Sequence, residues 1–270
     1  MKQILVTTSW DDGHMLDARL AELLKKYSIK GTFYIAPEDY ESKPENRLSN
    51  AQIKKISTDF EIGAHTMTHA HLTKISDAEA RSEIGDSKKY LEEVTGQEVR
   101  SFCYPRGEYR QRHVAMVRDA GFAYARTVER FSSGDGSLLE AGTSVNTYNH
   151  YFDLWKIARF AKFNPLKVVK YFQLDALAKA MFDRVLNEGG TFHLWGHSWE
   201  LDEHRDWEKL ENVLKYIAHR DGARYITNGD LVSLHTKKVL IVVPYFLPHL
   251  GGVEMYVFNI VKGLKQAGWD

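Results

Sequence analysis

The stretch ILVTTSWDDG, residues 4–13, joins an apolar, β-branched run to two adjacent carboxylates and a glycine. The run Ile4–Thr8 has the composition of a strand. A helical pattern, Leu16–Tyr27, follows at once and places its leucines on one face. A second strand pattern, Gly31–Ile35, comes next. Strand, helix and strand in this order predict two parallel strands joined by a crossover helix.

The same alternation continues along the chain. Further strand patterns are Phe60–Ala64, Ser101–Tyr104, Phe122–Arg126, Thr191–Trp195 and Arg224–Thr227. Further helical patterns run from the capping box at Ser76 to Val94, from Pro165 to Asn187 and from Asp206 to His219. Residues 129–153 show no clear period, and within them the run Ser132–Ser137 predicts an exposed loop. About seven parallel strands favour an α/β fold, a distorted (β/α) barrel, over residues 1–235.

The pattern changes over residues 236–270. A fully apolar strand pattern, Val239–Val243, is followed by Gly251-Gly252-Val253-Glu254 and a helical run from Met255 to Ala267. This predicts one βα unit at the start of a truncated Rossmann-like domain. Because one such unit cannot bury both faces of its strand, we expect the natural protein to be longer than 270 residues.

The composition excludes several classes of protein. Hydrophobic residues make up 43% and charged residues 27% of the 270 residues, which excludes a disordered or fibrous chain. The 36 basic and 36 acidic residues balance, so we expect no nucleic-acid partner. The lone Cys103 cannot form an intrachain disulfide. We find no signal peptide and no transmembrane segment, and expect a cytoplasmic protein.

Polar residues follow three of the predicted strands. Asp11 and Asp12 come after the first, His65 and His69 after the third, and His197 after the sixth. Catalytic groups of α/β barrels gather at these strand ends. On a helical turn, histidines four residues apart share one face and one metal ion. Asp12 is the natural third ligand, and Asp11, pointing the other way along an extended chain, is left to act on the attacking water.

Each of these signals also has an ordinary structural interpretation. Asp-Asp-Gly is a common turn sequence, a histidine pair can arise by chance, and His193 fits a buried, hydrogen-bonded strand residue. The combination, with each group at a strand end, favours a metal site.

Four motifs resemble those of the polysaccharide deacetylase family, the NodB-type carbohydrate esterases. Ser9–Gly13 resembles the family motif Thr-Phe-Asp-Asp-Gly, and His65–His69 matches its His-Ser/Thr-x-x-His motif. Phe102–Gly107 resembles the third motif, and Leu194–Glu200 resembles the fifth. Together the motifs extend the resemblance over residues 1–235.

The resemblance implies a metal-dependent hydrolase that removes acetyl groups, N-acetyl or O-acetyl, from a sugar or polysaccharide. Asp12, His65 and His69 would hold a divalent metal, zinc in many members, with cobalt or nickel as alternatives. Asp11 would be the general base, and His197 the general acid that protonates the leaving amine. The substrate-binding candidates are Tyr104, Pro105, Arg106, Trp195 and Trp199, with a backbone N–H near Arg106 for the oxyanion.

The third and fourth motifs depart from the family pattern. Members often carry an arginine on the base early in the third motif, where this chain has Cys103. Whether Arg106 replaces that charge is open. The fourth motif, which tunes the acid histidine, is not recognisable, and His150 and Asp153 are candidates for its role. Trp195 and Trp199 fit core packing as well as sugar stacking.

The C-terminal stretch resembles the start of a retaining glycosyltransferase with two Rossmann domains, in which a Gly-Gly-x-Glu sequence opens a helix. This resemblance implies a glycosyltransferase domain in the same parent chain and a role in cell-surface glycan biosynthesis. A generic βα turn is the alternative. For the main domain, the alternatives are a non-catalytic carbohydrate-binding domain and a metal hydrolase acting on a non-sugar amide.

Overall fold

The computed structural model describes residues 3–134, 136–148, 153–235, 241 and 251–266. The chain divides into two compact units, Met1–Gly229 and Asp230–Asp270. No helix among the described residues is long and apolar enough to cross a membrane.

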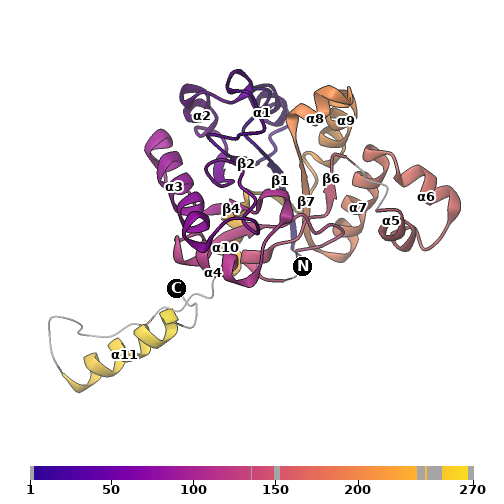
Figure 1. Ribbon diagram of the computed structural model, residues 1–270. Helices are drawn as coiled ribbons and strands as arrows, with labels where there is room; N and C mark the ends of the chain where they lie inside the picture. Colours follow the sequence, from indigo (N-terminus) through magenta and orange to yellow (C-terminus); the bar gives the residue numbers. More distant parts are fainter. Residues whose placement is uncertain (1–2, 135, 149–152, 236–240, 242–250, 267–270) are drawn as a thin grey trace. The chain divides into compact units, whose positions relative to one another are not determined.

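The first unit is built on a parallel sheet in the order β5-β4-β3-β2-β1-β7-β6, and β8 also pairs with β1 (Figure 1). The strands are β1 Ile4–Trp10, β2 Thr32–Ile35, β3 Glu61–Ala64, β4 Ser101–Cys103, β5 Tyr124–Arg126, β6 Val145–Asn146, β7 Gly190–Gly196 and β8 Ala223–Tyr225. Within the described ranges no pairing joins β5 to β6, so the barrel is incomplete. The predicted distorted α/β barrel is confirmed in this curled, open form.

Helices connect and cover the strands (Figure 1). Those of the first unit are α1 Asp17–Lys26, α2 Asn50–Ile56, α3 Asp77–Thr95, α4 Gln111–Asp119, α5 Leu154–Phe160, α6 Pro165–Tyr171, α7 Leu174–Glu188, α8 Ser198–Glu203 and α9 Trp207–Ile217. The helix α10, Asn228–His235, begins at the end of the first unit and lies mostly in the second. The predicted capping box opens α3, where Ser76 accepts from the Glu79 N–H, and Gly96 ends that helix in the left-handed conformation.

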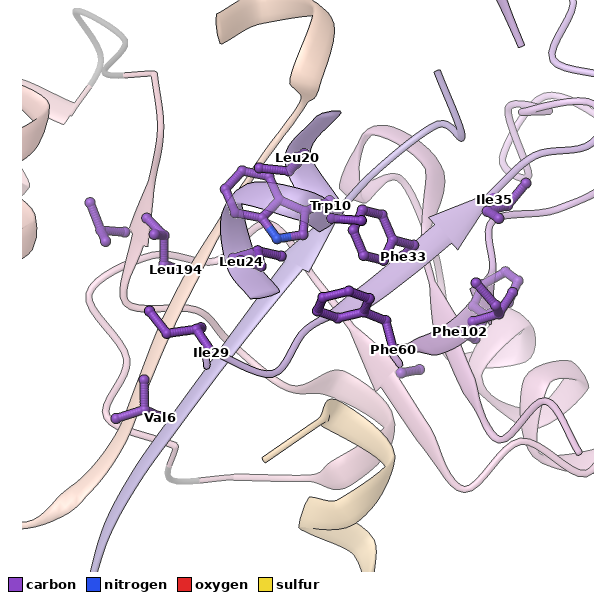
Figure 2. Packing of buried hydrophobic residues seen from close by; sticks show 14 of the residues in the cluster. Val6, Trp10, Leu20, Leu24, Ile29, Phe33, Ile35, Phe60, Phe102 and Leu194 are labelled. Atoms are coloured by element: carbon purple, nitrogen blue, oxygen red, sulfur yellow. The ribbon is translucent and has the colours of Figure 1, made fainter. Parts of the chain in front are cut away.

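The central strand β1 is buried along almost its whole length, as its apolar composition predicts. Trp10 at its end is fully buried beside Leu20 and Leu24 of α1 (Figure 2). On the neighbouring strand, Phe33 makes an edge-to-face contact with Phe60. This packing fixes the end of β1, from which the two acidic residues of the site emerge.

One local prediction was wrong, and one strand was not predicted. The single helix expected from Pro165 to Asn187 is two helices, α6 and α7, because Gln173 between them has an extended backbone. The region 129–153, in which the sequence shows no clear period, contains β6, outside the predicted loop Ser132–Ser137. This strand has only two residues, which is too short for any periodicity to reveal it.

In the second unit, α10 is followed by α11, Gly252–Gln266, which is close to the expected helix Met255–Ala267. Of the expected strand 239–243, only Ile241 lies within the described residues.

Candidate active site

The end of β1 presents Asp11 and Asp12 in different directions. The backbone turns sharply after the strand, with left-handed φ values of 79° at Asp12 and 76° at Gly13. A side chain at Gly13 is excluded, because its Cβ would lie 2.7 Å from Ile35 Cγ2. The two adjacent carboxylates have separate sets of partners because of this turn, and not because of the extended backbone on which the prediction relied.

His65 and His69 follow β3, and their rings lie 4.9 Å apart. The expected helical turn between them is absent: the segment is irregular, with left-handed φ values at Thr66 and His69. Glu83 of α3 holds this segment by accepting two backbone N–H hydrogen bonds of 2.9 Å from it. Hydrogen bonds from Glu83, and not the expected helix geometry, therefore hold the segment that places the two histidine rings side by side.

Asp12 and the two histidines form a set of ligands suited to a cation. Asp12 Oδ1 lies 3.6 Å from Nε2 of both His65 and His69, and it has no hydrogen-bond partner within the described residues. Burial by itself would raise the pKa of Asp12, but His197, His65 and His69 together with a Trp199 hydrogen bond lower it to about 2. An ionised carboxylate with a buried, unpaired oxygen facing two imidazoles fits a metal site.

The partners of the two histidines favour ligand roles. The His65 Nδ1–H donates to the Cys103 carbonyl oxygen at 2.8 Å, which leaves the Nε2 lone pair facing Asp12. Burial lowers the pKa of His65 to about 4, so the ring is neutral, as a metal ligand must be. His69 Nδ1 lies 3.1 Å from Glu41 Oε2, a carboxylate that orients the ring from outside.

Two other groups of possible ligands, Asp11/His65/Cys103 and Asp39/Glu41/His69, occur in the described part of the chain. Each has an arginine on one of its carboxylates, Arg126 on Asp11 and Arg106 on Glu41. A second cation there would face a guanidinium. The Asp12 group is therefore the most suitable for a metal.

Arg126, at the end of β5, is the partner of Asp11, and sequence analysis missed it. Both side chains are buried and form an ion pair. Arg126 lies opposite Cys103 in the register of β5 and β4, and its Nη2 is 2.8 Å from the Cys103 Sγ. The small Cys103 therefore leaves room for a guanidinium from the next strand. Arg126, and not Arg106, lies on Asp11. The sequence signal for Arg126 was a charged residue at the end of the strand pattern Phe122–Arg126.

His197 follows β7 and faces the same site. Its Nε2 lies 3.9 Å from Asp12 Oδ2, and its Nδ1 lies 2.7 Å from Glu200 Oε2, in the first turn of α8. Burial alone would lower the pKa of His197, but Asp12 and Glu200 raise it to about 9. The imidazole is therefore protonated at neutral pH.

Glu200, three residues beyond His197, was a second residue that sequence analysis overlooked. Of the two residues expected to tune His197, Asp153 pairs instead with Arg130, and His150 lies outside the described residues. His193, by contrast, is a buried strand residue whose Nε2 lies 2.8 Å from the Ser9 hydroxyl, which fits its ordinary structural interpretation.

A pocket of about 660 Å³ opens over these groups, lined also by Tyr104, Arg106, Trp195 and Trp199. Trp199 Nε1–H donates to Asp12 Oδ2 at 2.9 Å, so this indole orients a candidate ligand. Trp195 is almost fully buried, and the Arg126 guanidinium lies 4.3 Å from its ring centroid. Pro105 is buried at the start of the 3₁₀ turn Pro105–Gly107 and is not among the residues that line this pocket.

Comparison with known proteins agrees with this fold. The family model for polysaccharide deacetylase matches residues 1–125. The YxkH protein of Bacillus subtilis (strain 168) is 28% identical over 130 residues, which cover 47% of this chain and 45% of that protein. The peptidoglycan-N-acetylglucosamine deacetylase of Bacillus cereus is 26% identical over 120 residues, 43% of this chain and 42% of that one. The matches span less than half the length of these relatives.

Solved structures share the fold over a longer range. A Mycobacterium smegmatis protein assigned to the polysaccharide deacetylases has a TM-score of 0.64 at 16% identity, covering 86% of this chain and 90% of that one. A family 4 acetyl xylan esterase from Clostridium thermocellum, in complex with a cobalt ion, has a TM-score of 0.55 at 19% identity, covering 85% and 91%. Residues 1–125 are thus similar in sequence to the polysaccharide deacetylase family, and the solved structures share the fold of the first unit.

Proposed function

We propose that the first unit is a metal-dependent deacetylase that hydrolyses an acetyl group, N-acetyl in the first instance, from a sugar or polysaccharide. The observation that carries this proposal is the unpaired Asp12 oxygen facing His65 and His69, with Asp11 and His197 beside it. The family match and the pocket over these residues support it.

Asp12, His65 and His69 would hold a divalent metal ion, for which zinc is our first choice, with cobalt and nickel as alternatives. When bound, such an ion polarises an acyl carbonyl and lowers the pKa of water. The chain's part is to supply one anionic and two neutral ligands in a fixed arrangement.

Asp11 acts as the general base. Arg126 and the Asp11 backbone N–H, which donates to the Gly196 carbonyl oxygen at 3.1 Å, fix this residue at the floor of the pocket. Asp11 Oδ1 has no hydrogen-bond partner within the described residues and is available to take a proton from the attacking water. Arg126 holds the carboxylate in one orientation.

His197 acts as the general acid. Because its pKa is about 9, it carries a proton to give to the leaving nitrogen at neutral pH. Glu200 fixes the ring through Nδ1 and leaves Nε2 facing the reaction. The Arg106 backbone N–H would support the oxyanion, while Tyr104 and Trp199 would contact the sugar.

The test is acetate release from N-acetylglucosamine oligomers by chelated protein reloaded with zinc, cobalt or nickel. We expect no release from the chelated protein and restored release with at least one metal. O-acetylated sugars and acetylated peptides, run in parallel, identify other acyl substrates. Tight binding of one metal equivalent without release from any substrate would contradict the proposal and favour a carbohydrate-binding domain.

We also propose that residues 236–270 begin a glycosyltransferase-like domain, which would link the deacetylase to cell-surface glycan biosynthesis. The start of α11 at Gly252, in the Gly-Gly-x-Glu sequence, supports this proposal. Cloning and assaying the complete natural reading frame for sugar transfer tests it. A continuation without a second α/β domain would contradict it.

A further inference from the structure

Helices α5 and α6, together with the connection between them, expose an unusual set of large apolar side chains. Elsewhere in the described part of the first unit, only Met15 and Tyr40 are large apolar side chains with such exposure. The set consists of Leu154 (50% exposed), Trp155 (69%), Phe163 (58%), Leu166 (84%) and Val169 (72%). Five large apolar side chains exposed within residues 154–169 are typical of an interaction surface.

These side chains are not an unfinished part of the core. Each helix already buries another apolar face, with Ile157 and Phe160 on α5 and Val168 and Tyr171 on α6 packed in or against the core. The exposed residues lie outside that packing. The ring centroids of Trp155 and Phe163 lie 5.5 Å apart. Both helices therefore carry apolar side chains in addition to those that pack against the core.

The same segment is strongly basic. Residues 154–171 contain no aspartate or glutamate, although the whole chain has no net charge. Lys156 pairs with Glu129, and the other basic side chains have no acidic partner within the described residues. The basic residues are Lys156, Arg159, Lys162, Lys167 and Lys170.

This surface adjoins the candidate active site. Arg159 and Lys162 line a second pocket of about 660 Å³. Arg130 and Lys156 line both this pocket and the pocket over Asp12. A partner held by α5 and α6 would therefore lie beside the opening of the site.

We propose that α5 and α6, the basic apolar hairpin, dock this protein on the surface of an anionic lipid bilayer. Lysine and arginine side chains pair with anionic headgroups, while tryptophan, phenylalanine and leucine enter the boundary of the acyl chains. Aliphatic residues such as Leu166 and Val169 have no use in binding a nucleic-acid backbone. The inference does not depend on the deacetylase activity.

Charge complementarity favours an external anionic partner over the chain's own surfaces. A second copy would bring the same positive charge to this surface. The helix α11 contains one acidic residue, Glu254, against Lys262 and Lys265, and therefore offers no negative face. An anionic bilayer supplies both the negative charge and the apolar phase that the hairpin requires.

The experiment is sedimentation of the full chain with phosphatidylcholine vesicles, with and without about one third phosphatidylglycerol. We expect binding to anionic vesicles at least about tenfold tighter than to neutral ones, and weakened by salt, which screens surface charge. Equal binding to both vesicles, or no binding to either, would overturn the proposal.

Two double variants separate the two contributions. L166S/V169S removes apolar contact, K167E/K170E reverses charge, and each should weaken binding about tenfold. K54E/K89E makes the same charge change at exposed positions of α2 and α3 and should bind like the parent. Circular dichroism checks that all variants fold.

Other occupants give distinct results. If the control K54E/K89E loses as much binding as K167E/K170E, the effect is one of net charge and the docking surface is wrong. A dimer in solution that L166S/V169S converts to monomer would assign the surface to a second copy. D11N should still bind vesicles, and the hairpin variants should still deacetylate soluble oligomers, which keeps this proposal separate from the proposed function.

Discussion

Two arginine–carboxylate pairs flank the candidate site, and they differ in burial. Arg126 and Asp11 are 0% and 3% exposed, whereas Arg106 and Glu41 are 23% and 47% exposed. Removing one partner of a buried pair leaves the other charge buried and uncompensated. When one partner of an exposed pair is removed, water solvates the charge that remains. The arginine inside the third motif, Arg106, thus forms the weaker pair, and Arg126, which is distant in sequence, holds the base.

Replacing the buried arginine should have the largest effect. Arg126→Met leaves Asp11 buried without a counter-charge, so we expect a loss of about 3–5 kcal/mol in the free energy of unfolding. Urea denaturation measures it, and acetate release should fall with it. A variant as stable and active as the parent would show that the buried pair has no such role.

Moving the charge between strands tests the register argument. In the double variant Cys103→Arg/Arg126→Met, the guanidinium comes from β4, directly opposite its original position. We expect kcat about tenfold above that of Arg126→Met alone, because a charge-assisted contact to Asp11 is restored. A double variant no better than the single one would mean that the charge must come from β5.

Neutralising the partner of His197 should change the pH profile. Burial lowers the pKa of His197, but Asp12 and Glu200 raise it to about 9, so activity should fall on the alkaline side as the ring loses its proton. Glu200→Gln removes one stabilising charge from the imidazolium, and the alkaline limb of kcat/KM should move to lower pH. An unmoved limb would exclude Glu200 as the tuning residue.

Replacing Arg106 of the exposed pair should have the smallest effect on the free energy of unfolding. Arg106→Met is expected to cost about 0–1 kcal/mol of unfolding free energy. Because Arg106 lines the pocket, KM should rise more than kcat falls. A stability loss as large as that of Arg126→Met would remove the distinction between the two pairs.

The sequence predicted the parts of the site that lie in local motifs at strand ends. Asp11, Asp12, His65 and His197 each follow a strand, and a parallel barrel brings such ends together whatever the details of packing. Arg126 could not be assigned in this way, because its role depends on the pairing of β4 with β5 and on the small side chain of Cys103.

Two features of the fold also depend on tertiary contacts and could not be predicted from local sequence patterns. Seven strands follow from alternating patterns, but the two residues of β6 carry no pattern of their own and are placed by pairing with β7. The break at Gln173 likewise lies inside a run with continuous helical composition. Tertiary contacts decide both features.

The division of labour between the adjacent carboxylates is the central claim, and it is tested most directly by measuring metal content and acetate release together. After chelation and reloading, Asp12→Asn should retain far less than one metal equivalent. Asp11→Asn should keep its metal and lose about 10²–10⁴-fold in turnover. If Asp12→Asn binds metal like the parent, or Asp11→Asn deacetylates like the parent, the assignment of these two residues is contradicted.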